Sequence, residues 1–182
     1  MKKTLTLAAL CLLLPCVGVS GQKTPEPEKT PAPVSVEPLV TEGLVEAPVA
    51  DVWRIFSTAE GYTKLGVAKA TVDFRPGGLI VTVYDPSQAL DGEAGIRSEI
   101  LAYEPLRMVA TRIQRPPKGF PFKDAWKSVW TVVSLTDLGD KRTNVRVAMI
   151  GWGSDSDSQA MREFFRAGNE WVMKRLHAAF AP

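Results

Sequence analysis

A long amphipathic helix expected at the end of the chain constrains the fold more than any other feature. The pattern covers about residues 157–180, and its apolar side chains recur every three or four positions, as on one helix face. The stripe consists of Met161, Phe165, Gly168, Val172, Leu176 and Ala179, with Phe164 and Trp171 on its flank. Ser156 and Gln159 match a capping box at its start, where Asp155 and Asp157 suit the positive end of the helix dipole. Such a helix needs an apolar surface to cover.

That surface is expected to be an antiparallel sheet. In residues 143–150, Val145, Val147 and Met149 alternate with other residues, as in a strand with one buried face. The link Pro76-Gly77-Gly78 is typical of a tight hairpin, and no helical pattern separates the later strands. Strands are expected over residues 40–45, 67–74, 79–84, 96–103, 108–114, 126–135 and 143–150. The long helix is then expected to cross the concave face of this sheet.

A short helix is expected directly after the first strand. Pro48 suits the first helical position, and the helix is expected to end near residue 57. Its apolar face consists of Val49, Val52, Trp53 and Phe56. Residues 60–62 are expected to form a looser turn.

Four short motifs support a resemblance to a known family. They are the helix start Pro48-Val49-Ala50-Asp51-Val52-Trp53, the turns Phe74-Arg75-Pro76-Gly77-Gly78 and Tyr103-Glu104-Pro105-Leu106-Arg107, and residues 168–176 of the last helix. In order and spacing, residues 38–180 resemble the SRPBCC, or START-like, superfamily, in particular the branch similar to the C-terminal domain of activators of the Hsp90 ATPase. The resemblance implies an α+β helix-grip fold, a curved antiparallel sheet wrapped around a long C-terminal helix. Many relatives carry tryptophans where this chain has Lys64-Leu65-Gly66.

The first 21 residues have the pattern of a signal peptide. Lys2 and Lys3 precede an apolar stretch over residues 5–14, and Val19-Ser20-Gly21 offers small residues for cleavage. We therefore expect an exported protein, periplasmic or extracellular, that begins at Gln22. Four prolines make residues 22–36 a Pro-rich linker, and residues 37–182 form the START-like domain.

Two alternatives remain for this N-terminal segment. An uncleaved membrane anchor is one, because residues 4–22 carry no charge, although Pro15 and the small residues that follow disfavour it. Lipidation of Cys16 is the other and would make the protein an envelope lipoprotein, but such a cysteine usually follows a small residue rather than a proline. After cleavage at Gly21 no membrane span is expected.

Charge and composition exclude several classes of partner and site. Lys2 and Lys3 account for the whole net charge of +2, so nothing in the mature chain favours nucleic acid or anionic membranes. Both cysteines, Cys11 and Cys16, lie in the signal segment, which leaves a cleaved chain without disulfides or cysteine sites. His177 is the only histidine and is expected at the surface. Neither a metal site nor a cofactor is predicted, and the oligomeric state is left open.

The resemblance also implies a cavity between helix and sheet that takes a small apolar or amphipathic molecule. The expected lining combines apolar bulk with a few polar contacts. The candidates are Tyr84, Met108, Arg112, Trp130, Met149, Phe165 and Trp171. Arg112 is the most informative, because a buried arginine needs an anionic or acceptor partner. If it points outward with Arg115 and Lys118, it belongs to a solvated edge.

Catalytic groupings are sparse. Glu99 and Asp73 could act as acids or bases if they faced the cavity, but strand alternation places Glu99 with Arg97 on the solvent side. Asp155-Ser156-Asp157 lacks the glycine and later glutamate of a calcium loop. Non-covalent ligand binding is therefore the first hypothesis. An enzyme of the cyclase, dehydratase or hydrolase kind would need two cavity-facing ionisable residues in contact, and a protein-partner modulator would need an exposed apolar patch.

Overall fold

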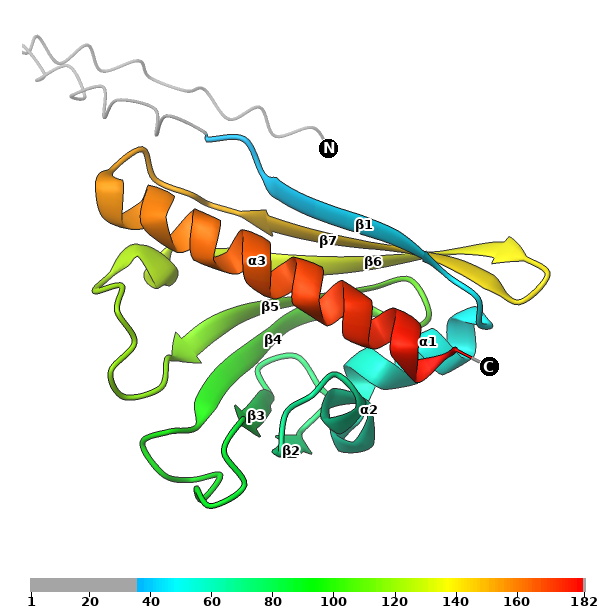
Figure 1. The fold of residues 1–182 in the computed structure, drawn as a ribbon, viewed down its shortest axis with the longest axis horizontal. Helices are drawn as coiled ribbons and strands as arrows, with labels where there is room; N and C mark the ends of the chain where they lie inside the picture. Colours follow the sequence, from blue (N-terminus) through cyan, green and yellow to red (C-terminus); the bar gives the residue numbers. More distant parts are fainter. Residues whose placement is uncertain (1–35, 182) are drawn as a thin grey trace, which may run out of the picture. The chain divides into compact units, whose positions relative to one another are not determined.

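One antiparallel sheet of seven strands forms the framework of the domain (Figure 1). The structure, a computed structural model, describes residues 36–181. The strand order is β1-β7-β6-β5-β4-β3-β2, so all neighbours except β1 and β7 are also consecutive in the sequence. The strands are β1 (Leu39–Val45), β2 (Lys69–Val72), β3 (Leu79–Val83), β4 (Ile96–Glu104), β5 (Met108–Arg115), β6 (Trp130–Gly139) and β7 (Arg142–Ile150).

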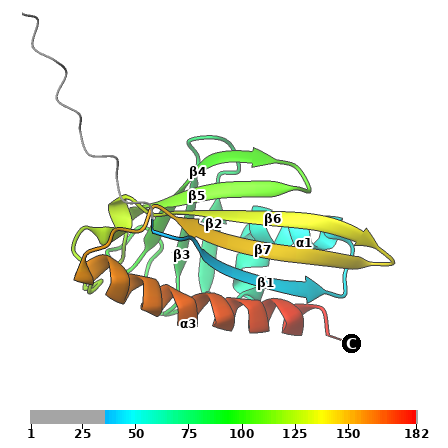
Figure 2. The ribbon, with the colours of Figure 1, turned by 90° about the horizontal axis from the view of Figure 1, so that it is seen from above.

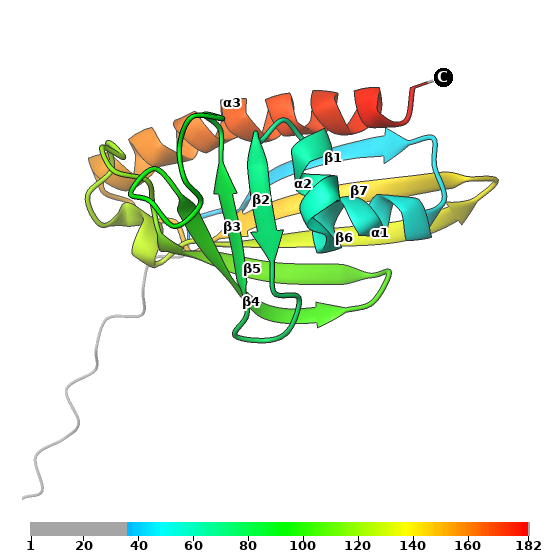
Figure 3. The ribbon, with the colours of Figure 1, turned by 90° about the horizontal axis from the view of Figure 1, so that it is seen from below.

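The helices lie on one side of this sheet. The long helix α3 (Ser156–Ala179) runs across it and contacts β1 (Figures 1 and 2). Two short helices, α1 (Val49–Ser57) and α2 (Ala59–Lys64), lie near the C-terminal end of α3, with α1 against β6 and β7 and α2 against β2 (Figure 3). The 3-10 turn η1 (Ala125–Lys127) also contacts α3. This arrangement confirms the expected α+β helix-grip fold.

The loose turn expected at residues 60–62 was wrong, because these residues belong to α2. Thr58 caps this helix, its Oγ1 accepting a hydrogen bond from the backbone N–H of Gly61 at 3.0 Å. Gly61 lets α2 fold back closely on α1, since a Cβ at this position would lie 2.3 Å from the carbonyl oxygen of Arg54. A glycine that suggests a turn in the sequence therefore serves a helix–helix contact.

The start of α3 also differs from the expectation. Asp155 is the N-cap residue, and its Oδ1 accepts a hydrogen bond from the backbone N–H of Ser158 at 2.9 Å. Ser156 is the first helical residue, so the capping box expected at Ser156 was wrong by one position. The side chain of Gln159 donates instead to the carbonyl of Gly153 at 2.7 Å. Helix capping thus accounts for Asp155 in the acidic segment 155–157.

Two strands differ from the expected bounds. The strand expected over residues 67–74 is confined to Lys69–Val72, and the one expected over residues 126–135 is displaced to Trp130–Gly139, after η1. The other five strands agree with the expected bounds within one residue at each end.

The buried side chains form two clusters. The larger cluster joins α1 and the C-terminal half of α3 to the sheet, and includes Val52, Ile55 and Leu176. The smaller cluster gathers around Met161 near the start of α3, and consists of Leu39, Val129, Met149, Trp152 and Met161. The two ends of α3 are therefore held by different sets of apolar contacts.

The predicted signal peptide at residues 1–21 lies outside the described residues, as does all but the last residue of the predicted linker at 22–36. Within residues 36–181, no helix combines the length and the apolar character that crossing a membrane requires.

Candidate functional site

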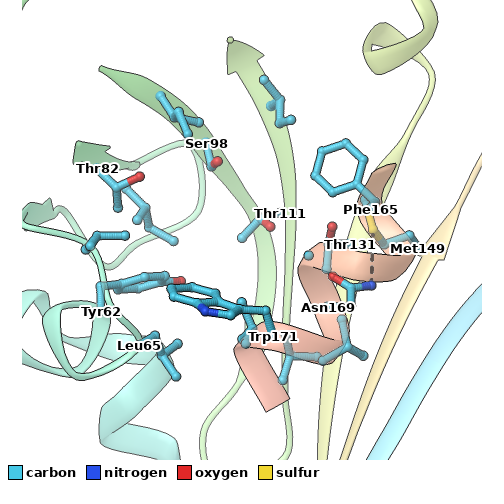
Figure 4. A pocket seen from close by; sticks show the side chains of 18 of the residues that line it. Tyr62, Leu65, Thr82, Ser98, Thr111, Thr131, Met149, Phe165, Asn169 and Trp171 are labelled. Atoms are coloured by element: carbon cyan, nitrogen blue, oxygen red, sulfur yellow. Dashed lines mark hydrogen bonds between the residues drawn. The ribbon is translucent and has the colours of Figure 1, made fainter. Parts of the chain in front are cut away.

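A cavity of about 650 Å³ lies between α3 and the sheet, and both core clusters contribute to its walls (Figure 4). Strands β3 to β7 provide one wall and α3 the facing one, while α2 and the segment after β5 provide further lining residues. Sites that bind drug-sized molecules usually have volumes of about 300–1,000 Å³. The cavity therefore has the size of a small-molecule site.

The walls are mainly apolar. Most lining side chains are branched aliphatic or aromatic, and they include Phe56, Leu65, Val67, Ile80, Ile96, Ile113, Phe120, Val133, Val147, Met149, Phe165 and Val172. Gly168 lies in the middle of the inward stripe of α3, where a Cβ would meet no atom within 4 Å. The absence of a side chain there enlarges the space beside the helix.

Exposed aromatic rings border the cavity. Tyr84 follows β3 and Trp171 lies on α3, and their ring centroids are 6.4 Å apart. Both are partly open to solvent, at 56% and 43% exposure, although large rings normally contribute strongly to burial. Phe164 is also exposed and packs edge-on against Phe120 at 6.1 Å. These rings offer an incoming apolar molecule a surface that solvent can reach.

The polar groups of the lining are uncharged. Among the residues that the structure describes, none of those lining the cavity is Asp, Glu, Lys, Arg or His. The polar side chains are Tyr62, Thr82, Tyr84, Ser98, Thr111, Thr131 and Asn169. Asn169 donates from Nδ2 to the Met149 sulfur at 3.5 Å, the one hydrogen bond among the side chains drawn in Figure 4. The hydroxyl groups shown there therefore have no partner among the lining residues drawn.

Four of these hydroxyls come from four adjacent strands. Thr111 on β5 lies directly opposite Thr131 on β6, which in turn lies opposite Met149 on β7. Ser98 on β4 lies opposite Ile113, two residues along β5 from Thr111. Thr82 on β3 continues the series, as Figure 4 shows. We call Thr82, Ser98, Thr111 and Thr131 the hydroxyl row.

Tyr62 faces the cavity from α2. Its hydroxyl makes no hydrogen bond to the other side chains drawn in Figure 4. Burial raises the pKa of the Tyr62 phenol well above its usual range, because the surrounding apolar atoms disfavour the phenolate. Tyr62 therefore presents a neutral hydroxyl to any bound molecule.

Of the seven residues proposed for the lining, the structure places four around the cavity and three outside it. Tyr84, Met149, Phe165 and Trp171 line it, whereas Met108, Arg112 and Trp130 do not. Arg112 is exposed and pairs with Glu99, its Nη2 lying 2.9 Å from Oε2, and Trp130 lies opposite it on β6. The expected cavity placement of these three was wrong. Whether the other four bind a ligand stays a prediction.

The error has a simple cause in strand geometry. Side chains alternate between the two faces of a strand, and in β5 it is Thr111 and Ile113, not Met108 and Arg112, that face the cavity. Trp130 shares the outward face because it lies directly opposite Arg112. The sequence analysis also missed the hydroxyl row, Tyr62 and Asn169. Thr111 could have been found by assigning the inward face of β5 to Val109 and Ile113.

The remaining candidate groups lie away from the cavity. Glu99 points to the other face of β4, as alternation predicted, and Asp73 is exposed and pairs with Arg75 at 2.9 Å. His177 is exposed, as expected. Among residues 36–181 no cluster of three or more His, Cys, Asp and Glu side chains is placed to hold a metal ion.

Known proteins of similar structure match about four fifths of this chain. The solved Aha1 dimer from Colwellia psychrerythraea is 14% identical, with a TM-score of 0.61, over 80% of this chain and 96% of that chain. A protein from Mesorhizobium loti is 16% identical, with a TM-score of 0.59, over 79% and 96% of the two chains. CalU16 from Micromonospora echinospora is 20% identical, with a TM-score of 0.57, over 79% and 65%. At these identities the likeness shows the fold alone.

A search of curated proteins gives no match to this sequence. The family model described as activator of Hsp90 ATPase homolog 1-like protein matches residues 46–181, from the end of β1 to the end of α3. This match covers most of the chain and every helix and strand of the domain except β1. The chain therefore belongs to the family of activator of Hsp90 ATPase homolog 1-like proteins.

Proposed function

We propose that this protein is an exported binding domain that holds an apolar or amphipathic small molecule between the sheet and α3. The observation that carries the proposal is the cavity of about 650 Å³ with apolar walls and an aromatic border. Transfer of an apolar molecule from water into such a space is favourable, because it removes apolar surface from water on both sides.

Binding is favoured over acid–base catalysis by the chemistry of the lining. Such catalysis needs ionisable groups that exchange protons near neutral pH and lie in contact with each other. The described lining offers tyrosines as its only ionisable side chains, and burial raises the pKa values of both Tyr62 and Tyr84. These groups stay protonated at neutral pH and supply hydrogen bonds rather than bases.

The family name refers to a cytosolic chaperone ATPase, and fold alone does not transfer that partner. The signal-peptide pattern at residues 1–21 supports export instead. Three of the exposed large apolar side chains, Tyr84, Phe164 and Trp171, line the cavity. Their exposure is accounted for by access of a ligand, without a protein partner.

Native mass spectrometry of the protein purified from its own cell envelope tests both parts of the proposal. We expect a reproducible extra mass that disappears on denaturation, on a chain that begins at Gln22. Protein that is consistently empty would count against ligand binding. A chain that is cytosolic and retains residues 1–21 would contradict export.

A further inference from the structure

The hydroxyl row supplies most of the polar groups on the sheet side of a mainly apolar cavity. Its members Thr82, Ser98, Thr111 and Thr131 interrupt an inward face otherwise formed by side chains such as Ile80, Ile96, Ile113 and Val147. Each hydroxyl can donate one hydrogen bond and accept others. None of the four is among the buried polar groups without a partner in residues 36–181, so water or a ligand in the cavity can serve as their partner.

The row is continued on the facing wall of the cavity. Thr111 and Thr131 are direct cross-strand neighbours, and Asn169 on α3 reaches the same area through its contact with Met149, the neighbour of Thr131. The Tyr62 hydroxyl adds a group from α2. Polar groups that donate and accept hydrogen bonds therefore cross the sheet wall from β3 to β6 and extend to α3 and α2, while aliphatic and aromatic side chains cover the rest of the lining.

The lining also limits the charge of an occupant. An ionised group in this space would lose its hydration, and none of the described lining residues carries an opposite charge. Neutral oxygen atoms of hydroxyl, ketone, ester or amide groups can instead exchange water for the threonine and serine hydroxyls. The cavity therefore suits an occupant that has no net charge and that turns polar atoms toward the sheet wall.

We propose that the ligand is an uncharged amphiphile that carries oxygen-containing groups along one edge and places them on the hydroxyl row. Ionised lipids and simple hydrocarbons are not its preferred occupants. This inference rests on the proposed binding function and adds to it the chemical class of the ligand. Thr111 and Thr131 are the residues that determine the preference, because they form the only directly opposed pair within the row.

The test uses three fluorescent probes of different polarity. Diphenylhexatriene is a hydrocarbon, its propionic acid derivative is anionic at pH 7, and 6-propionyl-2-dimethylaminonaphthalene is neutral with one ketone acceptor. The variant is the double substitution Thr111→Val and Thr131→Val, which keeps the branched shape and removes both hydroxyls. Thr136→Val on the exposed part of β6 is the matched control.

In the double variant we expect the ketone probe to bind about tenfold more weakly, because the threonine hydroxyls that donate to its carbonyl are removed. Its emission should shift to shorter wavelength for the same reason. Diphenylhexatriene should bind equally well or better, and Thr136→Val should bind both probes like the wild type. The anionic derivative should bind wild-type protein at least tenfold more weakly than the parent hydrocarbon.

The outcomes separate this inference from the proposed function. If wild-type protein binds none of the probes, the binding function fails and the inference fails with it. If diphenylhexatriene binds but the double variant retains wild-type affinity for the ketone probe, the binding function stands and the role of the hydroxyl row is refuted. Equal affinity for the anionic and uncharged hexatrienes would refute the exclusion of charge.

Discussion

Filling the cavity from Gly168 should stabilise the fold and abolish binding at the same time. Gly168 opens onto the cavity from the middle of α3, and no atom lies within 4 Å of the position that its Cβ would take. In Gly168→Phe the new ring therefore has room to enter the space without displacing neighbours. Ala167→Phe is the matched control, because Ala167 is the adjacent residue, is exposed and does not line the cavity.

The expected magnitude has two contributions. Replacing a helical glycine by phenylalanine gains about 0.5 kcal/mol of helix propensity. Burying about 80 Å² of ring surface adds about 2 kcal/mol at about 25 cal/mol per Å². A domain of this size changes its Tm by about 2–4 °C per kcal/mol, so Gly168→Phe should raise Tm by about 5–10 °C. Ala167→Phe loses about 0.5 kcal/mol of propensity and should lower Tm by about 1–2 °C.

Thermal unfolding followed by circular dichroism and titration with diphenylhexatriene measure the two effects on the same samples. We expect Gly168→Phe to reduce the affinity at least tenfold relative to the wild type, which is about 1.4 kcal/mol or more, and Ala167→Phe to leave it within about twofold. A stable Gly168→Phe protein that binds the probe like the wild type would show that the cavity is not the binding site. A lowered Tm would show that the ring cannot enter it.

Three further predictions concern single side chains. Because burial raises the pKa of Tyr62, the unfolded chain loses the phenol proton near pH 10, before the folded chain does. The free energy of unfolding should therefore fall above about pH 10. Urea titrations should show a smaller fall for Tyr62→Phe. In chemical denaturation, Asp155→Ala should lower the free energy of unfolding by about 1 kcal/mol and Ser156→Ala by much less. A larger loss for Ser156→Ala would show that Ser156 caps α3 instead. Gly61→Ala should lower the free energy of unfolding by about 3 kcal/mol, because the new Cβ would overlap the backbone of α1. Near-normal stability would show that α2 can move away from α1.

The architecture could be predicted from the sequence because its signals are long or repeated. The stripe of α3 repeats from Met161 to Ala179, about five turns, and the inward residues Val145, Val147 and Met149 of β7 alternate without interruption. Errors arose where the prediction depended on a single residue. A glycine such as Gly61 is typical of a turn, and only its close approach to the Arg54 carbonyl explains why it lies inside α2.

The site was harder to predict than the fold because it depends on which face each strand residue occupies. Assigning the residues of β5 to the wrong face selects Met108 and Arg112 for the cavity, whereas the opposite face carries Thr111 and Ile113. Large aromatic side chains were easier to identify, and Trp171 lines the cavity as expected. Small hydroxyl side chains give no signal of their own until the sheet register brings Thr111 next to Thr131.

The division of the core into two clusters has a consequence for how the cavity can vary. Each cluster fixes one end of α3 to the sheet, while Gly168, Thr111 and Thr131 belong to neither cluster. Substitutions at these three positions alter the volume or polarity of the cavity without removing an apolar contact from either cluster. The interior of this domain can therefore change in size and chemistry while both ends of α3 stay anchored to the sheet.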